Sequence, residues 1–283
     1  PVNCMPNPTA TAYGYLPNFP TPVATENSNI YDAAYWYQKN GNFSTLNRNN
    51  NTGQRTQQLY SYQANTNKLT QASFQVATGT PTLYNYTYDG NGNLASDPKN
   101  IINNITYSFF DDLPTVITKT NGGQSIYRYI GGSRISKKYS DIDEEFYIDQ
   151  IVLDQTGSVK SYQTASGYAV IVGNKMQYHH QVKDWQGSTR LTLDNGGTIE
   201  NATDYYPYGK KMPARIYYST NMEGYRYGYT GHEADGETGY QYHGARYYEE
   251  DLARYMSVDP LAMEYQAWST YCYVLANPVK LTD

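Results

Sequence analysis

Tyrosines recur at a nearly constant interval through the middle of this 283-residue chain. Five of them are separated by 21, 20, 20 and 21 residues: Tyr86, Tyr107, Tyr127, Tyr147 and Tyr168. Turn-forming steps such as Asn-Gly and Gly-Gly lie between them. A fixed period that leaves room for two short strands indicates a repeat in which every hairpin packs on its neighbours. A sandwich whose tyrosines fall on this period by chance is the alternative.

The composition favours sheet over helix. The chain has 34 tyrosines and 23 glycines. A tyrosine ring packs well on a half-buried pleated surface, while its hydroxyl reaches water or the backbone. We therefore predict an all-β fold of consecutive antiparallel β-hairpins in a spiralling sheet, shell-like or barrel-like. Helix is expected only in a few turns, near 260–268.

The chain divides into three predicted parts. Prolines punctuate residues 1–36 without periodicity, which is typical of a linker. Residues 37–200 carry the hairpin pattern, and residues 201–283 form a closing segment. The chain starts at Pro1 without a methionine or signal peptide, so we expect a mature or excised piece of a longer protein.

Charge and cysteine content exclude several classes of protein. The formal net charge is −5 and Lys and Arg do not cluster, which argues against a nucleic-acid partner. The sequence has no apolar run of 18 residues, so no membrane span is predicted. Cys4 and Cys272 could form one disulfide, but two free thiols are favoured because a single disulfide would do little to hold a fold together.

Five segments resemble a known family. They are YDGNGNL (88–94), DWQGSTR (184–190), YYPYG (205–209), the stretch 229–260 from YTGHEADGETGY to YMSVDP, and YCYVLANPVKLTD (271–283). On these residues the chain is similar to the RHS (rearrangement hot spot), or YD-repeat, family. The sequence of residues 260–283 is most similar to that of the Bacteroidetes-type members.

The resemblance implies an architecture and a role. RHS repeats form a ribbon of hairpins that spirals into a hollow shell, and the RHS core segment, here 201–283, closes one end. In several members a C-terminal passenger polypeptide, a toxin or effector, is held inside and freed by self-cleavage. The implied partners are that passenger and upstream repeats of the same protein. The implied location is secreted or at the surface of a bacterial cell, with no cofactor and no metal.

The resemblance also implies an aspartyl-protease-like pair. The matching residues are Asp259 and Asp283, 24 positions apart, with the cut expected beyond Asp283. Two carboxylates forced together cannot both ionise, so one keeps a proton while the other activates water. Pro260 biases Asp259 to an extended backbone. The alternative, favoured here, is that Asp259 accepts hydrogen bonds in a turn or pairs with Arg254, so at most an autoproteolytic enzyme is expected.

Two arginines match basic positions of the family core. Arg246 and Arg254 are expected to pair with carboxylates, because a buried guanidinium needs partners. The chain departs from the family nearby. Glu249-Glu250 and Ala253-Arg254 stand where Asp-Pro and Gly-Arg are usual, so an altered turn before Arg254 is expected. The neighbouring Tyr240, Tyr242, Tyr247 and Tyr248 are expected to be largely buried.

Other clusters give weaker signals. His179-His180 and His232-Glu233 could suggest a metal, but adjacent side chains on a strand point to opposite faces. The acidic run that ends at Glu144-Glu145 does not fit a calcium loop and is interpreted as a solvated hairpin tip. A binding module remains an alternative function, in which tyrosines or the tryptophans Trp36, Trp185 and Trp268 stack on carbohydrate or contact a protein.

Overall fold

The computed structural model describes residues 30–140, 142–173, 175–219 and 226–283. Within each sheet, every strand pairs antiparallel with the strands next to it in the chain, so the sheets are meanders of hairpins. The first sheet holds β1 (Ala33–Tyr37), β2 (Phe43–Asn49), β3 (Arg55–Tyr62), β4 (Leu69–Val76) and β5 (Thr82–Asn85). A small pair, β6 (Thr87–Tyr88) and β7 (Leu94–Ser96), follows it.

The largest sheet has twelve strands. They are β8 (Ile102–Tyr107), β9 (Pro114–Lys119), β10 (Gln124–Ile130), β11 (Ser133–Tyr139), β12 (Glu145–Ile148), β13 (Ile151–Leu153), β14 (Val159–Thr164), β15 (Gly167–Val172), β16 (Lys175–Lys183), β17 (Thr189–Asp194), β18 (Ile199–Tyr205) and β19 (Lys211–Tyr218). The C-terminal sheet holds β20 (Glu233–Asp235), β21 (Tyr240–Tyr242), β22 (Tyr247–Glu249) and β23 (Arg254–Tyr255). Two short 3₁₀ turns flank it, η1 (Tyr229–Gly231) and η2 (Val274–Ala276).

Many hairpins close on the same aspartate-glycine turn. The Oδ1 atom of Asp154 accepts backbone N–H groups two and four residues ahead, and the glycine three residues ahead, Gly157, has φ +84°. Asp184 and Asp194 make the same turn. The side chain replaces missing backbone partners, and glycine adopts the left-handed conformation at little cost. This local chemistry explains why turns recur along the ribbon.

Tyrosine hydroxyls tie successive hairpins together. Tyr62 donates to the carbonyl of Phe43 (2.9 Å), Tyr107 to that of Leu94 (2.8 Å) and Tyr129 to that of Pro114 (2.8 Å). Each ring packs against or within the core while its hydroxyl reaches an earlier strand. Of the five periodic tyrosines, Tyr86, Tyr127 and Tyr168 are buried, and the other two are half-buried. The expected β-hairpin repeat is confirmed.

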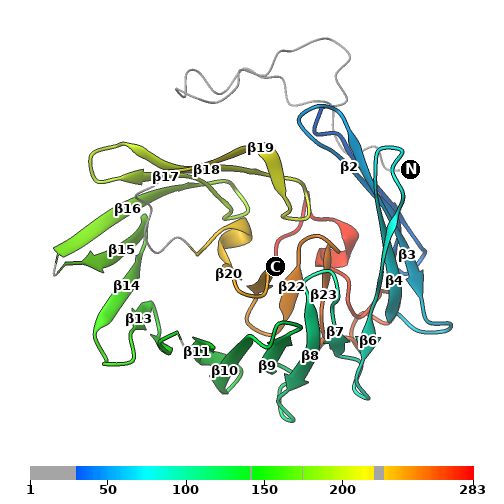
Figure 1. The fold of residues 1–283 in the computed structure, drawn as a ribbon, viewed down its shortest axis with the longest axis horizontal. Helices are drawn as coiled ribbons and strands as arrows, with labels where there is room; N and C mark the ends of the chain where they lie inside the picture. The colour runs from blue at the N-terminus through cyan, green and yellow to red at the C-terminus, as the bar shows by residue number, and fades with distance from the viewer. Residues whose placement is uncertain (1–29, 141, 174, 220–225) are drawn as a thin grey trace.

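The ribbon wraps around the C-terminal segment, which lies in its interior (Figure 1). Its two ends approach each other through side chains: Tyr31 donates to the carbonyl of Pro213 (2.6 Å) and Tyr206 to that of Asn49. No strand pairing joins β1 to β19 among the described residues, so the sheets wrap without closing into a barrel.

Element boundaries differ from the predicted ones in detail. The ribbon begins at Ala33, and residues 1–29 of the expected linker lie outside the described part. The predicted division between residues 200 and 201 falls within β18, and strand pairing carries the ribbon to Tyr218. Residues 260–268 form successive hydrogen-bonded turns instead of helix. No helix in the described part has the length and apolarity needed to cross a membrane.

The core is built largely from tyrosine rings of both the ribbon and the closing segment. Tyr240, Tyr247 and Tyr248 are at most 1% exposed, as expected, whereas Tyr242 is half-buried. The Tyr127 and Tyr247 rings lie 5.5 Å apart, which joins β10 to β22. Such pairs contribute beyond the area that they bury. The closing segment is therefore an internal part of the fold.

Candidate functional site

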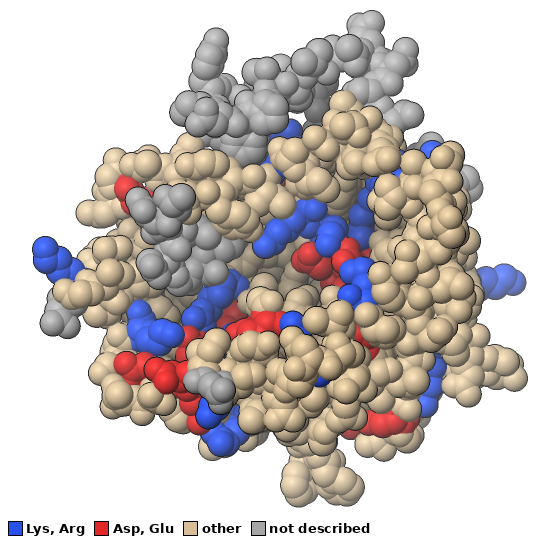
Figure 2. Space-filling view, viewed as in Figure 1, with Lys and Arg blue, Asp and Glu red and all other residues tan. Residues whose placement is uncertain are grey.

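A buried ionic network joins the ribbon to the closing segment. Arg134 on β11 pairs with Glu233 (2.6 Å) and Asp235 (3.0 Å) on β20, and Lys137 pairs with Asp235 (2.9 Å). Burial alone would raise the pKa of Asp235, but the charges of Arg134 and Lys137 hold it below its ordinary value. Figure 2 shows basic and acidic side chains gathered around the hollow of the molecule on this face.

A second ionic cluster surrounds the 249–251 turn, which links β22 to β23. Asp251 pairs with Lys99 and with Lys210 (2.8 Å), from two distant parts of the ribbon. Arg48 on β2 donates to the carbonyl oxygens of residues 250 (3.0 Å) and 251 (3.2 Å). Burial, followed by the charges of Asp251 and Asp97, raises the pKa of Glu249 to about 8. This turn therefore contacts three separate segments of the ribbon.

Asp259 lies at the start of a turn and is bound by an arginine. Its Oδ2 atom is 2.9 Å from Nη2 of Arg246, and its Oδ1 atom accepts the backbone N–H of Leu261 (2.8 Å), just after Pro260. The turn role expected in the alternative interpretation is present. The basic partner, however, is Arg246 and not Arg254.

Arg254 does not pair with a carboxylate among the described residues, so that expectation is wrong. Its guanidinium lies 4.7 Å from the centre of the Tyr271 ring and 5.4 Å from that of Tyr62, and it donates to the carbonyl of Asn67 (2.8 Å). Aromatic faces and a carbonyl replace the anion. This arrangement depends on wrapping, which brings β3 beside β23.

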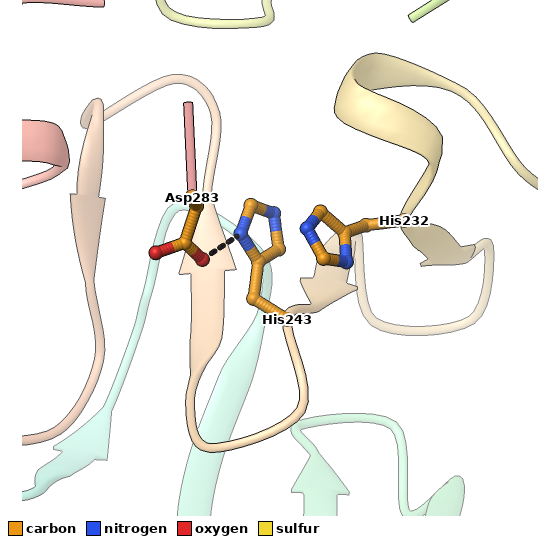
Figure 3. A group of neighbouring side chains, drawn as sticks. All are labelled: His232, His243 and Asp283. Atoms are coloured by element: carbon orange, nitrogen blue, oxygen red, sulfur yellow. Dashed lines mark hydrogen bonds and ion pairs between the residues drawn. The ribbon is translucent and has the colours of Figure 1, made fainter. Parts of the chain in front are cut away.

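The Asp283 side chain reaches His243 near the centre of the fold (Figure 1) and keeps 31% of its surface exposed. Its Oδ2 atom is 2.9 Å from Nδ1 of His243, and the His243 ring stacks on His232 with centres 3.8 Å apart (Figure 3). Burial would raise the pKa of Asp283, but hydrogen bonds from His243 and Tyr255 lower it to about 2. Burial, and then the nearby His243, lowers the pKa of His232 to about 4.

The same three side chains offer possible metal ligands. One ligand atom from each of His232, His243 and Asp283 lies within 4.8 Å of the others. The two imidazole planes, however, are only 18° from parallel. A zinc ion binds about 2.0–2.1 Å from nitrogen, along the lone pair in the ring plane. Stacked rings offer no point that satisfies both, so the geometry suits a hydrogen-bonded histidine–aspartate pair better than a metal.

The two aspartates of the predicted pair are connected through other residues. Arg246 holds Asp259 and lies 3.6 Å from the centre of the Tyr255 ring, and the Tyr255 hydroxyl lies 3.4 Å from Nδ1 of His243. His243 in turn contacts Asp283. No hydrogen bond joins the two carboxylates in the described part of the chain. A shared proton between them stays a prediction.

Sequence reasoning missed the histidine–aspartate pair. Strand register could have indicated part of it, because Glu233 lies opposite Tyr242 and so places His232 beside His243. The position of Asp283, 40 residues further on, follows only from the tertiary fold.

The other histidine and acidic clusters are structural. His179 is buried against Glu200 and stacks on Tyr168 (4.6 Å), whereas His180 is exposed on the other face of β16. The acidic run is not simply a solvated tip: Glu145 is buried and pairs with Arg226 (2.6 Å). Asp141 lies outside the described residues.

The cysteines and tryptophans named in the sequence analysis differ in their exposure. Cys272 forms no disulfide within the described residues, and Cys4, its one possible partner in the chain, lies outside them. Trp185 is 69% exposed and Trp36 38%, whereas Trp268 is half-buried.

Comparisons with known proteins agree with this architecture. No protein-family model matches the sequence. The chain is 40% identical over 109 residues to Salivary gland surface protein 1 of Aedes aegypti, covering 38% of this chain and 3% of that protein. It is 37% identical over 98 residues to Toxin subunit YenC2 of Yersinia entomophaga, covering 34% and 10%. The chain spans 10% or less of the length of these curated relatives.

Solved structures share the fold. The crystal structure of TcdB2-TccC3-TEV matches 90% of this chain and 15% of that one, with a TM-score of 0.60 and 19% identity. A structure of TcdB2-TccC3 matches equally well, with a TM-score of 0.60. These findings support the RHS-like resemblance. They do not test the Bacteroidetes-type assignment.

Proposed function

We propose that this chain is part of an RHS/YD-repeat shell of the Bacteroidetes type, secreted or displayed at a bacterial surface, that encloses a C-terminal toxin or effector. The observation that carries the proposal is the place of Asp283. Figure 1 places the end of the described chain at the centre of the wrapped ribbon. A polypeptide that continues from Asp283 would start inside the shell.

The ionic and aromatic contacts support the same function. A shell needs a closing segment that stays in place, and the pairs formed by Arg134 and Lys137 fasten β20 to the ribbon. The tyrosine rings between ribbon and closing segment exclude water from that joint. Similarity to toxin subunits of Yersinia entomophaga agrees with a passenger that acts on other cells.

Protease protection tests enclosure. The chain would be extended past Asp283 with its natural continuation and upstream repeats, then treated with a nonspecific protease under native conditions. We expect the passenger to survive at protease concentrations that digest the same passenger expressed alone. Equal digestion of the two would reject enclosure.

The proposed release step is hydrolysis by the pair Asp259 and Asp283. Water would add to the carbonyl carbon of the peptide bond just past an Asp-Pro-x-Gly motif that begins at Asp283. One carboxylate would take the proton from that water, and the other carboxyl would donate a proton to the leaving nitrogen. The products would be a new carboxyl end on the shell and a free amino group on the passenger.

Intact-mass measurement of the extended chain tests this step. We expect the parent to give two fragments and the Asp259→Asn variant to stay whole and folded. Glu264→Gln, on the same exposed turn region, is the matched control and should cut like the parent. An intact parent, or an Asp259→Asn variant that is cut, would reject the pair.

A second candidate function rests on the exposed aromatic rings. Phe109 and Phe110 are 88% and 93% exposed at the tip of the β8–β9 hairpin, and Trp185 is 69% exposed. Such rings could stack on carbohydrate or contact a partner protein. A glycan array would test carbohydrate binding. Binding that is lost in Trp185→Ala or in Phe109→Ala/Phe110→Ala would support this function.

A further inference from the structure

His243 is a tightly enclosed ionisable group beside Asp283. Its side chain has no exposed surface. The His232 ring covers one face at 3.8 Å, and the rings of Tyr248, Tyr255 and Tyr273 surround it at 5.2, 5.7 and 5.9 Å. With its ring held from several sides, the imidazole cannot swing away, so the direction of Nδ1 is fixed by packing.

That fixed nitrogen points at Asp283. The separation of 2.9 Å is a hydrogen-bond distance, and the Nδ1–H of a neutral imidazole can donate to the carboxylate. The other ring nitrogen lies 3.4 Å from Oε1 of Gln241, which is only a weak contact. The tight bond of His243 is therefore the one to Asp283.

Asp283 and Asp259 lie in different environments. Asp259 is held by Arg246 and by a backbone N–H of its own turn. The Asp283 carboxylate is held by hydrogen bonds from two buried groups, the Tyr255 hydroxyl and the His243 ring, and the neutral ring can orient one oxygen without bringing a permanent charge. In preorganised sites, a residue that does not touch the substrate often fixes the orientation of a reacting carboxylate through a hydrogen bond.

We propose that His243 is a positioning residue for self-cleavage. Its Nδ1–H fixes the orientation of the Asp283 carboxylate, and the stacked His232 ring keeps the His243 ring in place. This inference rests on the proposed function. His243 does not touch the bond to be cut and acts through Asp283. Against the effect of burial, this hydrogen bond and the one from Tyr255 lower the pKa of Asp283 to about 2 and so keep it ionised.

The test uses the extended chain with two substitutions at one position. His243→Phe keeps a flat ring but removes the donor, and His243→Asn places an amide N–H near the position of Nδ1. Without the donor, the pKa of Asp283 should rise towards the value of about 3.9 of a free aspartate. Cleavage by His243→Phe should then fall roughly tenfold more at pH 3 than at pH 6, relative to the parent. His243→Asn should restore most of the pH 3 activity.

Two controls separate this inference from the proposed function. His180→Phe, at an exposed histidine, should leave the pH profile unchanged. The carboxyl carbon of Asp283 would also be titrated by NMR in the Asp259→Asn background, where the chain stays whole. A parent that cuts and a His243→Phe variant with the same profile and the same Asp283 titration would overturn the role of His243 alone. A parent that never cuts would overturn both proposals.

Discussion

Ala253 adopts a backbone conformation that alanine seldom takes. Its φ is +58°, in the left-handed region, and its side chain is 1% exposed. Members of the RHS family usually have glycine in this turn, and glycine pays no Cβ penalty there. An alanine held in this conformation costs about 1–2 kcal/mol. The departure noted in the sequence thus places an alanine in a strained, left-handed position of the turn.

We expect Ala253→Gly to lower the free energy of unfolding less than an alanine-to-glycine change at a buried position without a positive φ. The matched control is Ala202→Gly, at a buried alanine in β18 whose φ is not positive. Both changes remove one methyl group, but only the first relieves strain. The free energy of unfolding of Ala253→Gly should exceed that of Ala202→Gly by about 1–2 kcal/mol in urea titrations. Equal values would show that the turn is not strained.

Tyr247, in the closing segment, contacts side chains of the ribbon and so stabilises the joint between the two parts. Its hydroxyl lies 3.0 Å from that of Tyr129 and 3.2 Å from Nη1 of Arg134. Tyr247→Ala should lower the free energy of unfolding by about 3 kcal/mol or more, as for other buried aromatic rings. Tyr178→Ala, at a ring that is 46% exposed, should cost much less. Calorimetry that finds Tyr247→Ala as heat-stable as the parent would contradict this role.

At the scale of elements, the 249–251 turn links the closing sheet to the ribbon through ion pairs that depend on pH. The carboxylates Asp97, Glu249, Glu250 and Asp251 face the cations Arg48, Lys99 and Lys210. The pKa of Glu249 is raised from 4.5 to about 8, so the folded state holds its proton at pH 7 and the unfolded state does not. The contribution of Glu249 to the free energy of unfolding is therefore fully present below about pH 4.5 and is lost as the pH rises towards 8.

Unfolding measured between pH 5 and pH 9 checks this sign. Each tenfold change in proton affinity is worth about 1.4 kcal/mol, so the parent should lose on the order of a few kcal/mol across the range. Glu249→Gln cannot ionise and should flatten that loss. Glu264→Gln, at an exposed site, should not. A Glu249→Gln variant with the parent's pH dependence would show that another group is responsible.

Local features of the fold could be predicted from the sequence, and distant ones could not. The Asn-Gly and Gly-Gly steps and the tyrosine period concern neighbouring hairpins, so they predict hairpins correctly. The partner of Arg254 is an aromatic pair because wrapping places Tyr62 beside it, and no spacing reveals that. In the same way Asp283 meets His243 only after the chain returns to the centre of the ribbon. Within the candidate site, the two aspartates and the carboxylate-bound Arg246 were therefore predicted, whereas the two histidines were not.

At the scale of the whole molecule, the ribbon and the closing segment form one structure. The core cluster draws on the ribbon from β1 to β10, on Tyr205 of β18, and on β21 to β23, so neither part buries its apolar surface alone. Ion pairs at β20 and at the 249–251 turn fasten the closing segment to opposite parts of the ribbon. The proposed enclosure and release of a passenger both require this internal position.

Hydrogen exchange followed by mass spectrometry tests that internal position most directly. Peptides that cover residues 240–256 should exchange as slowly as those of β8 and β9, because the two parts open only together. Rapid exchange of residues 229–283 beside a protected ribbon would show that the segment is a loosely attached tail. That result would contradict the account of a shell closed from within.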